Sequence, residues 1–250
     1  MSQTPFHLHD KKILVTGASS GIGRQVCISA SAMGAQVILN GRNILQLEET
    51  FAHLKGTGHR IISADLLQQH EREKLAMEIS TLDGLVHCAG TVKPFPIKFL
   101  DQQKIDGTLN LNFETPVLMM AALLKQKKIN KDASLVFLSS ISGQHPHKGG
   151  ATYGGSKAAL ESFVKVLALE LYAQGVRANC ISPGMVKTPM YDQAATEMSN
   201  EEMDKHVARY PLGVGFPEDV ANAAIFLLSS ASRWITGINI TLDGGFLLEK

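Results

Sequence analysis

The chain has 250 residues, of which 44% are hydrophobic and 19% are charged, and its formal net charge is +1. These values suit one globular domain, and they exclude a general electrostatic attraction to nucleic acid or to an anionic membrane. The cysteines Cys27, Cys88 and Cys180 are widely spaced, which predicts neither a zinc site nor a disulfide framework and favours a reducing compartment. The amino terminus is polar and the longest strongly apolar stretch, residues 117–124, is too short to cross a bilayer, so we expect a cytoplasmic protein.

Apolar runs and helical patterns alternate along the chain. Strands are expected over residues 11–17, 35–41, 60–65, 83–90, 133–140, 176–182 and 237–245. Helices are expected over residues 21–34, 44–55, 67–80, 100–128 (in one or two parts), 152–175 and 217–230. Residues 183–215 have an irregular pattern, and about residues 185–215 are expected to form a lid over the substrate.

The alternation of strand and helix predicts the fold class. Continuous apolar strands are typical of a parallel sheet that is covered on both faces. We therefore expect an α/β fold with one Rossmann-type, doubly wound domain over residues 1–250. Its seven-stranded parallel sheet would carry helices on both faces and a polar N-terminal tail at residues 1–10.

The glycine-rich stretch LVTGASSGIG allows two interpretations. It contains G-x-S-x-G, the turn that presents the nucleophilic serine of α/β-hydrolases. It also suits a strand-to-helix turn that holds a phosphate, where Gly17 permits the turn, Gly21 lets the backbone approach and Gly23 allows close packing. The hydrolase interpretation is weaker, because no earlier loop precedes this first strand to supply an oxyanion hole, and because only His206 follows His147.

A second group of polar residues lies downstream. In YGGSK, Tyr153 and Lys157 are four residues apart and therefore share one face of an expected helix. Ser140 ends the fifth expected strand, and the carboxyl ends of strands border the ligand crevice in an open α/β sheet. Each feature is ordinary by itself, but their joint occurrence in this order on these elements is not.

With these features the chain resembles the short-chain dehydrogenase/reductase family over nearly its whole length. The glycine turn has the family's T-G-x-x-x-G-x-G spacing, and further matches are NCISPGMVKTPM at 179–190, PEDVA at 217–221 and TGINITLDGG at 236–245. The resemblance implies an oxidoreductase that transfers a hydride between a nicotinamide cofactor and a ketone or secondary alcohol.

The resemblance also implies the catalytic roles. Tyr153 is expected to be the general acid/base, with the ammonium of Lys157 lowering a phenol pKa that is otherwise about 10. Lys157 is further expected to bind the nicotinamide ribose, and Ser140 the carbonyl oxygen of the substrate. Asn112 is expected to support a water-linked proton relay, with Asn110 as the alternative two residues away.

NADP(H) is the expected cofactor. Gly41 stands where an NAD-binding acid is usual, and Arg42 next to it suits a 2′-phosphate, although Ser20 stands where the family has a second basic residue. Cys88 replaces the first residue of the family's N-A-G motif, and Asp65 resembles the adenine-binding aspartate but also suits a helix cap. The residues expected to bind the cofactor are Gly17, Ser19, Ser20, Gly21, Ile22, Gly23, Arg42, Asp65, Leu66, Ala89, Gly90, Tyr153, Lys157, Pro183, Gly184, Val186 and Thr188.

Within the family, the chain is most similar to the 3-oxoacyl-acyl-carrier-protein reductases, so a carrier-bound 3-oxoacyl thioester is one candidate substrate. A basic cluster falls where those enzymes dock the acidic carrier, but Gln174 replaces their second docking arginine. The cluster consists of Lys125, Lys127, Lys128 and Lys131. Other small carbonyl or alcohol substrates stay open. An NADPH-binding module without turnover and a serine hydrolase are the alternative functions.

The substrate wall is expected to include the loop after Ser140 and the lid. His145 and His147 have H-x-H spacing but lack a third ligand nearby, so they are expected to be loop histidines and no metal is expected. The helices around residues 98–128 and 152–175 resemble those that pair subunits in the family. A homotetramer or homodimer is therefore expected, with no nucleic-acid or membrane partner.

Overall fold

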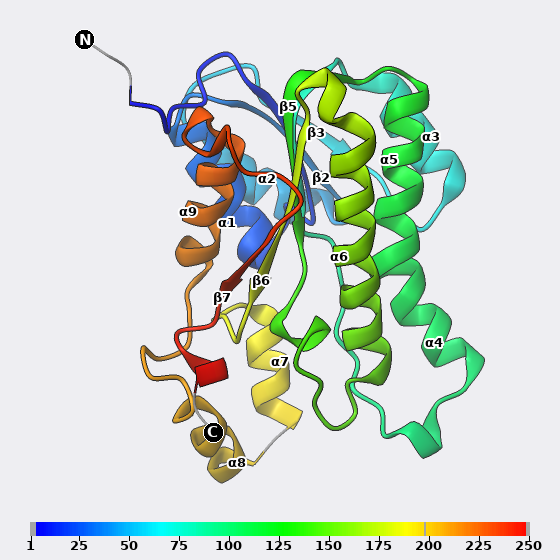
Figure 1. The fold of residues 1–250 in the computed structure, drawn as a ribbon, viewed down its shortest axis with the longest axis vertical. Coiled ribbons are helices and arrows are strands. Elements are labelled where there is room, and N and C mark those ends of the chain that lie inside the picture. The colour runs from blue at the N-terminus through cyan, green and yellow to red at the C-terminus, as the bar shows by residue number, and fades with distance from the viewer. Residues whose placement is uncertain (1–3, 198, 249–250) are drawn as a thin grey trace.

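The computed structural model describes residues 4–197 and 199–248. A sheet of seven parallel strands runs through the molecule in the order β3-β2-β1-β4-β5-β6-β7 (Figure 1), which confirms the predicted fold class. The strands are β1 (Lys12–Thr16), β2 (Gln36–Gly41), β3 (Arg60–Ser63), β4 (Leu82–His87), β5 (Ile129–Leu138), β6 (Arg177–Pro183) and β7 (Asn239–Leu242). The strand order reverses between β1 and β4, and ligands of open α/β sheets bind beyond the carboxyl ends at such a point.

Helices cover both faces of the sheet (Figure 1). One face carries α1 (Gly21–Ala32), α2 (Ile44–Ala52) and α9 (Pro217–Leu228), and the other α3 (Gln69–Glu78), α4 (Gln102–Leu109), α5 (Thr115–Lys125) and α6 (Ala151–Leu171). Successive strand residues point to opposite faces, so Leu14 packs into one apolar core while Ile13 and Val15 pack into the other. Burial on both faces explains the continuous apolar strands. No described helix has the length and apolar character needed to cross a membrane.

The helix expected over residues 100–128 consists of α4, a π-helical turn and α5, which follow one another directly. Between α4 and α5 the backbone is π-helical over Asn110–Glu114. A π-helical turn accommodates an extra residue within a continuous helix, and such turns are frequent at functional sites. The two expected parts are therefore joined without a loop.

The irregular stretch predicted for residues 183–215 is partly wrong. It contains α7 (Pro189–Glu197) and α8 (Asn200–Val207), which lie beyond the carboxyl end of the sheet (Figure 1). α8 begins with a capping box, because Ser199 Oγ accepts from the Glu202 amide at 3.3 Å and the Glu202 carboxylate accepts from the Ser199 amide at 3.0 Å. Met198, which belongs to the predicted lid, lies outside the described residues.

The predicted polar tail packs on the domain where it is described, from residue 4 onward. Leu8 is fully buried, and its amide donates to the Met33 carbonyl at 2.8 Å. The Pro5 carbonyl accepts from the Ala231 amide at 3.1 Å. These contacts fasten the start of the chain to the ends of α1 and α9.

Candidate functional site

The glycine turn between β1 and α1 has no room for side chains. Gly17 and Gly21 have left-handed φ angles of +66° and +51°. A Cβ atom on Gly23 would lie 2.1 Å from the Gly17 carbonyl oxygen, and one on Gly17 would lie 2.9 Å from the Ala89 nitrogen. The backbone is thus exposed to a close approach where the first amides of α1 have no helical partner, which suits a phosphate. Ile22 lines the adjacent cavity.

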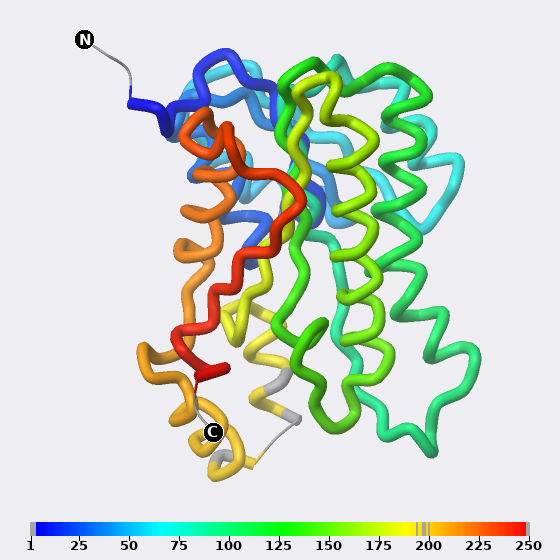
Figure 2. Tube along the Cα trace, viewed as in Figure 1, coloured from blue at the N-terminus to red at the C-terminus, as the bar shows by residue number. Residues whose placement is uncertain are grey.

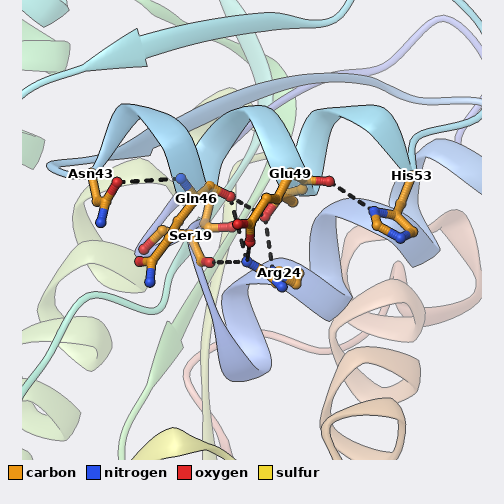
Figure 3. A network of polar contacts seen from close by, with 8 residues as sticks. Ser19, Arg24, Asn43, Gln46, Glu49 and His53 are labelled. Atoms are coloured by element: carbon orange, nitrogen blue, oxygen red, sulfur yellow. Dashed lines mark hydrogen bonds and ion pairs between the residues drawn. The ribbon is translucent and has the colours of Figure 1, made fainter.

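Side chains from α1 and α2 hold this turn on the side away from the cavity (Figure 3). The Arg24 guanidinium donates to the Ser19 carbonyl at 2.7 Å and to the Glu49 carboxylate at 3.0 Å. The Thr50 hydroxyl donates to the Ala18 carbonyl at 3.0 Å, and Thr50 is fully buried. Because Arg24 and Thr50 bind the Ser19 and Ala18 carbonyls, contacts within the protein fix the shape of the turn.

The predicted nicotinamide wall lies directly against the glycine turn. A Cβ atom on Gly21 would lie 3.2 Å from Thr188 Cγ2. Thr188 Oγ1 donates to the Val186 carbonyl at 3.2 Å, and Val186 is bridged to Gly215. Residues 183–188, which follow β6, therefore reach the glycine turn. The family resemblance implies a cofactor held between these two segments.

The predicted adenosine end is more open. Arg42 is exposed, and in the described part of the chain its guanidinium has no hydrogen-bond or ion-pair partner. A Cβ atom on Gly41 would lie 3.6 Å from Ser19 Oγ, so Ser19 and Arg42 border the same end of β2. Asp65 Oδ1 accepts from the Leu67 amide at 3.1 Å within the turn before α3, so the alternative that Asp65 caps the next helix is wrong, because the N-cap residue of α3 is Gln68. Ser20 is the N-cap of α1 but makes no side-chain cap bond.

Three of the four predicted catalytic residues, Ser140, Tyr153 and Lys157, line one cavity of about 830 Å³ at the carboxyl ends of the central strands. Ser140 and Tyr153 are joined by a side-chain hydrogen bond. Tyr153 and Lys157 lie one turn apart on α6, with the ammonium 5.8 Å from the phenol ring centroid. The cavity therefore brings together the Ser140 hydroxyl, which can hydrogen-bond a substrate oxygen, the Tyr153 phenol, which carries a proton, and the buried ammonium of Lys157.

The electrostatics of this group differ from the prediction. Burial raises the pKa of Tyr153 above its ordinary value, and the hydrogen bond with Ser140 opposes that rise. Burial also lowers the pKa of Lys157 to about 8, and its Nζ donates to the Leu138 carbonyl at 2.7 Å. Burial therefore sets the direction of the pKa shift of Tyr153, and the lowering expected from Lys157 is not seen in this geometry.

Asn112 rather than Asn110 faces this group. Its Oδ1 accepts from the Thr91 amide at 2.8 Å, and its Nδ2 donates to the Thr91 carbonyl at 2.9 Å and to Ser156 Oγ at 3.1 Å. A Cβ atom on Gly90 would meet both Asn112 Oδ1 at 3.2 Å and Lys157 Nζ at 3.5 Å. The missing side chain of Gly90 thus lets the amide and the ammonium approach each other.

Because Cys88 stands where the family has an asparagine, the centre of the sheet is hydrogen-bonded by Thr16 and His87. Thr16 Oγ1 accepts from the Ala89 amide at 3.2 Å and pairs with His87 Nδ1 at 3.0 Å. His87 is buried, and burial lowers its pKa to about 3 with help from the charge of Lys157. A neutral histidine therefore lies directly behind the cavity.

Glu161, one turn of α6 beyond Lys157, was not among the predicted site residues. Its Oε1 accepts from Ser139 at 2.8 Å and from Ser182 at 3.2 Å, and its Oε2 accepts from Gln144 at 2.9 Å. The carboxylate thus joins β5, β6 and the loop after Ser140. Its spacing of four residues from Lys157 places it on the same face of α6, which the sequence shows. Its three partners are distant in the chain, so their contacts with Glu161 could not be predicted from the sequence.

The comparisons with known proteins agree with this geometry. A family model described as enoyl-(acyl carrier protein) reductase matches residues 17–247. A 3-oxoacyl-(acyl-carrier-protein) reductase, FabG, of Rickettsia bellii is 31% identical over 242 residues, which cover 96% of this chain and 98% of that protein. The chain belongs to the short-chain dehydrogenase/reductase family.

Other short-chain dehydrogenases/reductases share the fold and most of the length. An L-xylulose reductase of Caenorhabditis elegans is 34% identical, over 95% of this chain and 96% of that protein. The structure of a short-chain type dehydrogenase/reductase from Mycobacterium ulcerans has a TM-score of 0.87 at 32% identity, over 98% of this chain and 92% of that one. The family is one of oxidoreductases and implies a nicotinamide cofactor. Its members with similar identity to this chain carry names with different substrates.

The contact between Gly23 and Gly17 yields the first prediction. Gly23→Ala should weaken binding of the nicotinamide cofactor and lower the free energy of unfolding by about 1–3 kcal/mol, because the new methyl group overlaps a backbone oxygen. Urea denaturation and an NADPH fluorescence titration measure the two effects.

Gly107→Ala is the control. No atom lies within 4 Å of a Cβ atom there, so this change within α4 should stabilise the protein by up to about 1 kcal/mol. Wild-type binding by Gly23→Ala would contradict the packing argument.

The buried His87 yields a prediction about acid stability. Its pKa is about 3 in the folded protein against an ordinary 6.5, so between these values the unfolded chain binds a proton that the folded protein does not. This histidine therefore lowers the free energy of unfolding as pH falls from 6.5 to 3, by an amount on the order of 4 kcal/mol. His87→Asn should flatten the pH dependence measured by urea denaturation.

The exposed His70 provides the matched control. His70→Asn should lose stability with falling pH as the wild type does, because it leaves the buried His87 in place. If His87→Asn and the wild type lost stability equally between pH 6.5 and 3, His87 would not be held neutral by burial.

Proposed function

We propose that the protein is an NADPH-dependent oxidoreductase that reduces a ketone to a secondary alcohol, or catalyses the reverse reaction. One observation carries this proposal: Ser140, Tyr153 and Lys157 line the cavity that begins beside the glycine turn. The fit of a nicotinamide cofactor is supported by the open backbone at Gly23 and by Thr188 against Gly21. Bound NADPH supplies the hydride.

In this mechanism, the protein's own groups handle the substrate oxygen and its proton. The Ser140 hydroxyl and the Tyr153 phenol both hydrogen-bond the carbonyl oxygen, and Tyr153 gives it a proton as the alcohol forms. The raised pKa of Tyr153 keeps the phenol protonated before reaction, which suits an acid in the reducing direction. Lys157 would hold the nicotinamide ribose, since an ammonium has three N–H donors and its bond to the Leu138 carbonyl uses one of them.

We assign Asn112 a positioning role in the same reaction. Its amide is fully used in bonds to Thr91 and Ser156, so it fixes the segment after β4 against α6. That segment includes Ala89 and Gly90, which would pack on the cofactor. The proposed proton relay would then pass near Asn112 rather than through its side chain.

We propose that Arg42 selects NADPH over NADH. Its guanidinium is exposed beside Gly41 and Ser19, and in the described residues no carboxylate pairs with it. A guanidinium free of protein partners suits a 2′-phosphate through several charge-assisted bonds. The cofactor would further contact the segments of the predicted set, namely Gly17, Ser19, Ser20, Gly21, Ile22, Gly23, Asp65, Leu66, Ala89, Gly90, Pro183, Gly184, Val186 and Thr188.

The substrate range includes 3-oxoacyl thioesters, on the likeness to FabG of Rickettsia bellii. One feature of the basic cluster limits a docking role: Lys128 Nζ donates to the Met77 and Ile79 carbonyls at 3.1 and 2.6 Å, where it stabilises the end of α3. We further propose a homodimer or homotetramer in the cytoplasm. Exposed apolar side chains on α5 and α6, Leu118 and Leu169 among them, support self-association.

The mechanism predicts the behaviour of Tyr153→Phe. This variant should lower kcat for ketone reduction at least about 100-fold, because the acid is lost, while NADPH binding changes little. NADPH oxidation at 340 nm over acyl thioesters, sugar ketones and cyclic ketones, together with NADPH fluorescence, measures both effects. Tyr172→Phe, at an exposed tyrosine, is the matched control and should retain wild-type turnover. Near-normal turnover by Tyr153→Phe would refute the mechanism. NADPH binding without oxidation by the wild type over the whole panel would indicate a binding module.

The cofactor assignment predicts that Arg42→Gln raises KM for NADPH about 10- to 100-fold and leaves KM for NADH nearly constant. The loss concerns charge-assisted bonds that only the 2′-phosphate makes. Arg60→Gln is the control, because that arginine pairs with Glu78 on the surface and should not affect either cofactor. A wild-type kcat/KM with NADH equal to that with NADPH would exclude the assignment.

A further inference from the structure

The outer part of the catalytic cavity is formed by three segments distant in sequence. They are the loop between β5 and α6, the end of α8 with the turn after it, and the C-terminal turn that carries Phe246. Figure 2 shows these green, yellow-orange and red segments at the same end of the molecule. Their basic and imidazole side chains that line the cavity are His145, His147, Lys148, His206 and Arg209.

Positive charge predominates at the cavity wall. Among the described residues that line the cavity there is no aspartate or glutamate, whereas Lys148, Lys157 and Arg209 are cations. Burial raises the pKa of Tyr210 and the nearby Asp243 adds to that rise, while the Asp243 carboxylate accepts from two backbone amides of the C-terminal turn. A cavity lined by charges of one sign concentrates counter-ions, because its walls have a lower dielectric constant than water. The excess of positive charge thus lies within the cavity, although the net charge of the whole chain is only +1.

Arg209 is the best-positioned of these cations. Its guanidinium lies over the Phe246 ring, 4.2 Å from the centroid, and Phe246 also contacts Tyr210 with centroids 4.6 Å apart. The Tyr210 hydroxyl accepts from the Met185 amide at 3.0 Å, which fixes this aromatic stack to the loop after β6. In the described part of the chain the guanidinium has no ion-pair partner, so its N–H groups are oriented by stacking and not used by a carboxylate.

Two histidines line the same cavity as Arg209. His206 packs on Phe246 with centroids 5.5 Å apart, and His147 Nδ1 lies 3.4 Å from Ser142 Oγ in the loop between β5 and α6. Burial lowers the pKa of His206, and the charges of Arg209 and His147 lower it further. The three groups therefore repel one another when charged, and an anion among them would remove that cost.

We propose that the substrate is a carbonyl compound that carries its own anionic group, a carboxylate or a phosphate, and that Arg209 binds this group with His147 and His206. This inference rests on the proposed ketone reduction and adds the substrate class. The carbonyl lies at Ser140 and Tyr153, and the anion lies at the outer end of the same cavity. Neutral His206 donates an N–H to the anion, while Arg209 supplies the charge.

Matched pairs of ketones test this proposal. Oxo acids from 3-oxobutanoate to 7-oxooctanoate are each compared with their methyl esters, and hydroxyacetone phosphate with hydroxyacetone. kcat/KM is measured with NADPH for every compound. For at least one chain length the acid should exceed its ester about tenfold or more, as a charge-assisted bond contributes. The phosphate pair distinguishes the two anions. A carboxylate site gives a larger ratio of kcat/KM for an oxo acid over its ester than for hydroxyacetone phosphate over hydroxyacetone, and a phosphate site gives the reverse.

Variants then connect the preference to the site. Arg209→Gln should lower the ratio of acid to ester at least tenfold, and Arg209→Lys should restore part of it. Lys205→Gln is the matched control, because Lys205 lies on α8, one turn before Arg209, but pairs with Glu201 and does not line the cavity. This control should keep the wild-type ratio.

The outcomes separate the two proposals. Esters reduced as well as acids at every chain length, or an equal loss of the ratio in Lys205→Gln and Arg209→Gln, would overturn the anion site and leave the reductase proposal intact. If the wild type reduced no ketone, thermal shifts with the same acids and esters would still test the site. A higher Tm with an acid than with its ester, lost in Arg209→Gln, supports the site, and equal Tm values would overturn it.

Discussion

The buried ammonium of Lys157 is the interaction on which the catalytic end of the molecule depends. Its bond to the Leu138 carbonyl joins α6 to the end of β5, and this link fixes which face of α6 looks into the cavity. Burial of a charge is unfavourable unless it is paired or hydrogen-bonded, so the geometry tolerates little change. The same ammonium meets Asn112 over Gly90 and contributes to keeping His87 neutral. Folding and the arrangement of the site are therefore coupled through one side chain.

The other half of the site is fixed by backbone contacts rather than by charge. The glycine turn is held from behind by Arg24 and Thr50, and from the front by Thr188 against Gly21. All these contacts are made between groups of the protein itself. A turn held in one shape by such contacts loses little conformational entropy when a ligand binds, which favours affinity.

Sequence patterns predicted the sheet, its helices and the residues that surround the cavity, because apolar periodicity and short motifs are local properties. They missed α8, although Ser199 and Glu202 form a capping box that is visible in the sequence. The sign of the pKa shift of Tyr153 could not be predicted, since it depends on burial by residues distant in the chain. For the same reason the convergence of Arg209 with the loop histidines appears only in the folded protein.

The π-helical segment Asn110–Glu114 has a consequence for how this chain can vary in length. Each residue of an α-helix turns the chain by about 100°, and a π-helical turn takes up one extra residue without breaking the helix. Deletion of one residue there would therefore let α4 and α5 continue as one regular α-helix, with α4 still against α6. The same deletion would turn the Asn112 amide away from Thr91 and Ser156. The extra residue thus sets the direction of one side chain beside the catalytic group and leaves the packing of the two helices unchanged.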